Sequence, residues 1–149
     1  MPTVSFLWHL HQPAYRTADR VAHAPWVLLH AGGAYLTLAR AIAEIGGRGQ
    51  VVSIVPTLLE QLIAYRDGAV IDPVADALTT AAADLSAAQR ATVLEWSAHM
   101  TARQAARHPR LRELAGRTAA EISEGGVRDV QVLTILAHAG DAAWLDPEL

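Results

Sequence analysis

Two histidines separated by a single residue, His9 and His11, are the side chains of this sequence best suited to chemistry. They lie in the segment LWHLHQPAY, where Gln12 adds an amide that donates and accepts hydrogen bonds and Pro13 restricts the backbone. A spacing of two places both imidazoles on one face of an extended strand. Such side chains can hydrogen-bond the hydroxyls of a sugar ring, ligate a metal ion, or simply be satisfied by backbone partners at a strand end.

The elements that must position these histidines follow from two short apolar runs. Residues 3–8 (TVSFLW) and 51–55 (VVSIV) lack strict alternation, which is typical of interior strands of a parallel sheet with both faces buried. A helix is predicted between them, beginning at Pro25 and ending at Gly46. One face of this helix carries the apolar residues Tyr35, Leu38, Ile42 and Ile45. The order predicts two parallel strands, with both imidazoles pointing into an open cleft where the first strand ends.

The remainder of the chain has helical signals almost throughout. An apolar stripe made of Leu58, Leu59, Leu62 and Ile63 is predicted to end at residues 67–68. Asp72 followed by Pro73 is a typical helix start, and Ser86 with Gln89 has the spacing of a capping box. Further helices are predicted from Pro109 and over residues 127–139. The sequence therefore predicts an α/β fold with two parallel strands and a large helical segment.

Five blocks occur in order along the chain and can be compared with known families. They are HLHQP (9–13), PWVLLHA followed by Tyr35 (25–35), VPTLLEQL (55–62), HPRLREL (108–114) and RDVQVL (128–133). This ordered set resembles the N-terminal part of glycoside hydrolase family 57. The resemblance implies that residues 1–149 are part of an incomplete (β/α)7 barrel that acts on α-glucans, as amylases, pullulanases, branching enzymes and glucanotransferases do.

The same resemblance implies which site residues this chain holds. His9 and His11 would line the sugar subsite beside the scissile bond, with Gln12 and Trp26 as further substrate contacts. The family uses a retaining mechanism, with a Glu nucleophile and an Asp acid/base in motifs that follow the last block. We assign no catalytic residue to this chain, which we expect to be truncated before those motifs, and we expect no hydrolysis by the chain alone. Three positions depart from the family pattern: Ser53 replaces an Asn, Ile135 an amide and His138 a tryptophan.

Other polar and aromatic residues are weaker candidates. Glu60, Glu95 and Asp141 are expected to be exposed or capping carboxylates on helices. Trp8 and Trp96 are expected in the core, and Trp26 is a better sugar platform than these or Trp144. His30 or His99 could complete a metal site with the first two histidines. Two alternatives to an enzyme fragment therefore stay open: a non-catalytic α-glucan-binding or regulatory module, and a histidine-ligated metal-dependent hydrolase.

Composition limits the remaining functions. The chain of 149 residues is 52% hydrophobic, has a formal net charge of −3 and contains no cysteine. These values indicate a folded chain and exclude disulfides and thiol chemistry, and no basic patch suggests a nucleic-acid partner. With neither a signal peptide nor a membrane span apparent, we expect a cytoplasmic protein without a cofactor. A second polypeptide is a possible partner, because a barrel cut after two strands would expose residues 51–55 and favour association.

Overall fold

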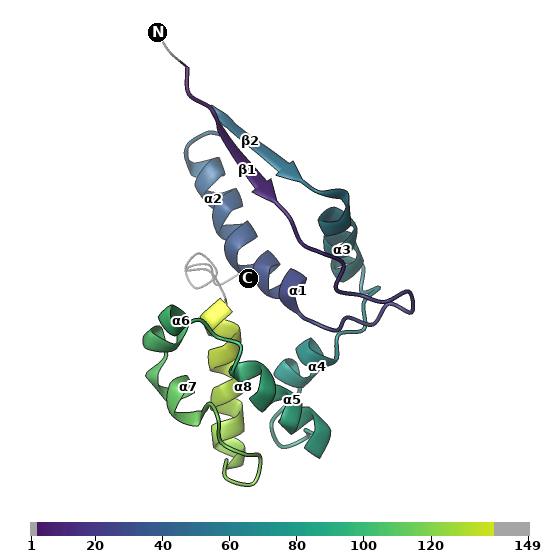
Figure 1. Cartoon of the computed structure of the whole chain (residues 1–149), viewed down its shortest axis with the longest axis vertical. Helices are drawn as coiled ribbons and strands as arrows, with labels where there is room; N and C mark the ends of the chain where they lie inside the picture. Colours follow the sequence, from purple (N-terminus) through teal and green to yellow (C-terminus); the bar gives the residue numbers. More distant parts are fainter. Residues whose placement is uncertain (1–2, 139–149) are drawn as a thin grey trace. The chain divides into compact units, whose positions relative to one another are not determined.

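The computed structural model describes residues 3–138, which fall into two compact units (Figure 1). The first unit contains residues 3–71 and holds both strands, and the second contains residues 72–138 and is helical. The fold is thus mixed α/β and mostly helical, with two parallel strands in one sheet.

The two strands pair as the sequence predicts. Strand β1 (Phe6–Leu10) and strand β2 (Gln50–Ile54) are parallel neighbours, with Phe6 opposite Gln50 and Leu10 opposite Ile54. The first strand begins later than expected and includes His9, and the second begins one residue earlier than expected. The parallel pairing confirms the strand–helix–strand interpretation.

The connection between the strands is one continuous helical segment of three parts. Helix α1 (Trp26–His30) continues through a π-helical turn, η1 (Ala31–Tyr35), into helix α2 (Leu36–Glu44). Pro25 stands just before the first helical residue. Gly46 and Gly47 both have a φ of +70°, a conformation that glycine adopts without steric cost, and they end the helix as predicted.

Helix α2 packs against one face of the sheet. Leu38 and Ile42 of α2 and Leu10, Val52 and Ile54 of the strands line a common apolar cavity of about 220 Å³. Because side chains alternate along a strand, His9 lies on the opposite face from Leu10.

The prediction that both faces of the strands are buried is wrong for this part of the chain. Leu7 is 67% exposed and Val51 is 52% exposed, and Phe6, Val52 and Ile54 are also exposed. Continuous apolar sequence indicates a strand made to be covered on both faces. Within residues 3–138 the sheet has only two strands, and the apolar side chains are only partly covered.

Helix α3 (Pro56–Arg66) follows β2 and ends before Asp67, as predicted. Its buried positions are Leu58, Gln61 and Ala64, whereas Leu59 and Ile63 are exposed. The expected stripe is therefore rotated, because a buried glutamine occupies a place that hydrophobicity alone assigns to leucine.

The second unit contains five helices within residues 72–138: α4 (Pro73–Thr79), α5 (Ala87–Ser97), α6 (Ala102–Arg107), α7 (Pro109–Leu114) and α8 (Glu124–His138). Both predicted caps are present. The Asp72 carboxylate accepts hydrogen bonds from the backbone N–H groups of residues 74 and 75, and Ser86 and Gln89 form a reciprocal capping box. A second capping box, Thr101 with Gln104, begins α6, which the sequence analysis did not predict.

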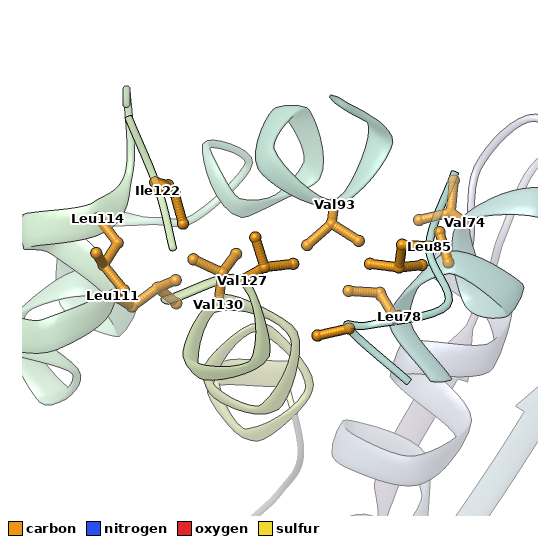
Figure 2. Close-up of a cluster of buried hydrophobic side chains, with 11 residues drawn as sticks. Val74, Leu78, Leu85, Val93, Leu111, Leu114, Ile122, Val127 and Val130 are labelled. Atoms are coloured by element: carbon orange, nitrogen blue, oxygen red, sulfur yellow. The ribbon is translucent and has the colours of Figure 1, made fainter. Parts of the chain in front are cut away.

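Helix α8 is the centre of the second unit and contacts α4, α5, α6 and α7. Its Val127 and Val130 are fully buried and point toward side chains from the surrounding helices, among them Val93 and Leu111 (Figure 2). Trp96 packs against this cluster, as expected for a core aromatic. Among the helices of residues 3–138, none is long and apolar enough to cross a membrane.

Candidate functional site

The two histidines that the sequence singles out share one exposed face at the end of β1. Their rings are stacked, with centroids 6.3 Å apart and planes inclined by 27°. His9 lies opposite Ser53 of β2, and its Nδ1 is 3.4 Å from the Ser53 hydroxyl oxygen. Neither ring is packed in a hydrophobic core, and both point the same way, as predicted. The open cleft expected at this place stays a prediction.

Gln12 and Trp26 are connected through Tyr35 and His30, and Tyr35 lines the apolar cavity with Leu10 and Val52 on the face of the sheet opposite His9. The Gln12 side chain is largely buried and its amide nitrogen donates to the Tyr35 hydroxyl at 3.0 Å. The Tyr35 ring lies 5.9 Å from the His30 ring, which in turn lies 6.1 Å from the Trp26 ring. His30 Nδ1 donates to the Trp26 carbonyl oxygen at 2.7 Å, so its proton is on Nδ1. The helical segment that contains Tyr35 (η1) thus holds the loop that begins at His11, through the hydrogen bond from Gln12.

Gln61 of α3 clamps the loop after His11, a role that the sequence analysis missed. Its side-chain oxygen accepts from the backbone N–H of Tyr15 at 2.8 Å. Its amide nitrogen donates to the carbonyl oxygens of Pro13 at 2.9 Å and Thr57 at 3.0 Å. The residue is 3% exposed, so its hydrogen bonds form away from bulk water and fix the loop firmly. A glutamine in the middle of an apolar helix face was the available signal.

The same loop is tied to α3 by an ion pair between Arg16 and Glu60. Glu60 is exposed on its helix, as the sequence analysis expected of a carboxylate that is not catalytic. Beyond Arg16 the chain turns back, with the Thr17 N–H donating to the Val21 carbonyl oxygen at 3.0 Å. The Thr17 hydroxyl donates to the Asp19 carboxylate and thereby lowers the pKa of Asp19 below its ordinary value.

The remaining candidates lie away from this face or outside the described residues. Trp8 is exposed rather than in the core, because the sheet is uncovered, and its indole N–H donates to the Gln50 side-chain oxygen at 2.7 Å. The His99 ring contacts the Trp96 ring in the second unit at a tilt of 31°, with centroids 4.6 Å apart. Asp141 and Trp144 lie outside the described residues.

The donors for a metal site do not come together in the described chain. Residues 3–138 contain no group of three or more histidine, aspartate or glutamate side chains arranged to hold a metal ion. His30, one proposed third ligand, donates through Nδ1 to the Trp26 carbonyl oxygen and is not grouped with His9 and His11 into such a set. Zinc in enzymes takes three protein ligands and an open position, and the part of the chain that the structure describes places no third ligand beside His9 and His11.

Comparison of the chain with protein-family models, with curated proteins and with solved structures finds no match. A functional assignment therefore depends on the ordered sequence blocks and on the geometry of the first unit.

Proposed function

We propose that this chain is the N-terminal portion of an incomplete (β/α)7 barrel of the glycoside hydrolase family 57 type. In this proposal it supplies the part of an α-glucan site that His9 and His11 line. The observation that carries the proposal is the position of these stacked rings at the C-terminal end of β1, on the face that α2 leaves open.

The two faces of the sheet support this assignment. In β/α barrels the helices cover the outer face of the strands, and functional residues gather at the carboxyl ends of the strands. Helix α2 packs on the face that carries Leu10 and Val52, so in the proposed barrel the face that carries His9 and Ser53 would be the interior one. Leu7 and Val51 are exposed apolar residues on that face. In a closed barrel, inward-facing side chains of the other strands would cover them.

The chemistry of the face suits a polyhydroxylated ligand. Two imidazoles and the Ser53 hydroxyl together offer both donors and acceptors within reach of one another. Gln12, next to His11 in the chain, is held by Tyr35 and would fix the loop before ligand arrives, whereas the Trp26 ring contacts His30 within α1.

Catalysis would require groups that this chain does not supply. A retaining glycosidase uses two carboxyl groups about 5–5.5 Å apart. In the described loop and α3, the Glu60 carboxylate pairs with Arg16 and the Asp19 carboxylate accepts from Thr17. The nucleophile and the acid/base would come from polypeptide outside these 149 residues, whose addition should restore hydrolysis.

Calorimetric titration of the purified chain with maltoheptaose tests the proposal. We expect binding that weakens at least about tenfold in each of His9→Ala and His11→Ala, because each loses hydrogen bonds to hydroxyls. His99→Ala is the matched control, since that exposed histidine lies in the second unit and should leave the affinity unchanged.

The absence of maltoheptaose binding, or affinity that neither His9→Ala nor His11→Ala changes, would overturn the proposal. Binding that appears only with added zinc would instead support the metal-dependent alternative. If the chain binds but stays inactive when the rest of the barrel is supplied, the non-catalytic binding module becomes the better description.

A further inference from the structure

A second cavity, with a polar lining, lies beside the loop that follows His11, at the Arg16–Glu60 ion pair. It has a volume of about 320 Å³ and lies between residues 14–18 and the first two turns of α3. Neither His9 nor His11 lines it. Its volume reaches the lower end of the range of about 300–1,000 Å³ that small-molecule sites occupy.

One wall of this cavity is already rigid. Gln61 contributes to the lining, and its side chain makes three hydrogen bonds to the backbone at 2.8–3.0 Å. The loop on the other side is therefore fixed to α3 without any ligand. A site whose walls are fixed in advance loses less entropy when it binds.

The polar groups at the cavity combine donors with acceptors. Arg16 and Glu60 line it and pair with each other. A guanidinium has five N–H donors and a carboxylate about four acceptor positions, so one ion pair leaves most of both unused. The Glu60 side chain is 70% exposed, which keeps its remaining acceptor positions accessible. The Thr57 hydroxyl, also in the lining, has no hydrogen-bond partner within residues 3–138.

We propose that this cavity binds two neighbouring hydroxyls of a sugar ring and forms a glucan subsite separate from the one at His9 and His11. One hydroxyl donates to the Glu60 carboxylate while the next accepts from the Arg16 guanidinium. Because the two charges offset each other, the cavity favours a neutral polyol over an anion. The choice of a glucan as ligand rests on the proposed function, whereas the diol chemistry rests on the cavity itself.

The test is titration of maltotriose into the chain and into Glu60→Gln and Arg16→Met variants. Each variant removes one charge-assisted hydrogen bond, so we expect the dissociation constant to rise at least about tenfold in both. Glu113→Gln is the matched control: it breaks the exposed Arg110–Glu113 ion pair of 2.8 Å in the second unit and should change nothing. In the unaltered chain, the backbone amide resonances of Thr57 and Glu60 should shift during the titration, which checks the site without any mutation.

Each outcome separates this inference from the proposed function. Loss of affinity in the Arg16 and Glu60 variants but not in His9→Ala or His11→Ala would keep the cavity site and refute the histidine site. Loss in the histidine variants alone, with no shift at Thr57 and Glu60, would overturn the cavity site and keep the proposed function. Competition by inorganic phosphate would identify an anion site and overturn the diol assignment.

Discussion

The two units of this chain distribute their apolar residues in opposite ways. In the second unit the large side chains converge on α8, and Leu111 and Val127 are completely buried (Figure 2). In the first unit the strands leave Leu7, Val51 and other apolar residues exposed, although their sequence is as hydrophobic as a core. The helical unit is organised around a core of its own, whereas the sheet has surfaces that suit further covering.

The candidate binding features lie in only one of the two units. The stacked histidines and the polar cavity both belong to the first unit, which is the unit with exposed apolar strands. Exposed apolar patches and unpaired strand edges are typical of surfaces that meet other polypeptide. The association expected of residues 51–55 therefore stays a prediction that fits the exposure of β2.

The largest difference between the units should appear when one leucine is truncated in each. Leu111→Ala empties a fully buried site and should lower the free energy of unfolding by about 2–5 kcal/mol. Leu7→Ala removes a side chain that is 67% exposed and should cost no more than about 0.5 kcal/mol. Urea unfolding followed by circular dichroism measures both values. Similar losses in the two variants would show that Leu7 is covered in solution and would remove the contrast.

A smaller loss of stability should follow when a buried glutamine is replaced in either unit. Each of these glutamines fixes backbone groups by hydrogen bonds, one in the first unit and one in the second. Gln61 fixes residues 13–15, and Gln131 donates to the carbonyl oxygens of Ala77 at 2.8 Å and Thr80 at 2.7 Å. Replacement of either by leucine leaves backbone groups unpaired and should cost about 1–3 kcal/mol. Native-state hydrogen exchange should show where each cost falls.

In Gln61→Leu the Tyr15 amide should lose protection, and maltoheptaose affinity should fall with it. In Gln131→Leu the loss of protection should stay within the second unit and sugar affinity should not change. A Gln61→Leu variant with full protection at Tyr15 would contradict the clamp.

The smallest effect concerns a helix start. Ser86→Ala removes the hydroxyl that caps α5 and should cost about 1 kcal/mol. Thr92→Ala is the matched control, because this hydroxyl donates at mid-helix to the Ala88 carbonyl oxygen and provides no cap. Differential scanning calorimetry should show a lower melting temperature for Ser86→Ala only. An equal fall in melting temperature in both variants would mean that the Ser86–Gln89 capping box stabilises the helix no more than a mid-helix hydroxyl hydrogen bond does.

Local signals in the sequence predicted much of this structure because their physics is local. Asp72, Ser86 and Gly46 act on backbone groups within a few residues, so their caps and the helix stop could be identified from sequence alone. The spacing of His9 and His11 was equally informative, because alternation along a strand determines their common face.

Features that depend on distant partners could not be predicted in this way. Gln61 binds Tyr15 and Pro13, which precede it by 46 and 48 positions in the sequence. Nothing near Gln61 in the sequence indicates which loop it binds. The prediction that both faces of the strands are buried failed for the same reason. An apolar run indicates that a strand needs to be covered, but it does not indicate that a covering element is present. The Thr101–Gln104 box was readable from its spacing, but its helix, α6, is only six residues long and contains no buried residue that would produce an apolar stripe.

The most direct test of the account observes the histidines themselves. In the chain labelled at histidine with ¹³C and ¹⁵N, titration with maltoheptaose should move the ring resonances of His9 and His11 together along one binding curve. Those of His99, which contacts Trp96 in the second unit, should remain where they are. If the rings of His9 and His11 stay unchanged at a saturating concentration of the sugar, the proposed glucan site at the end of β1 is wrong.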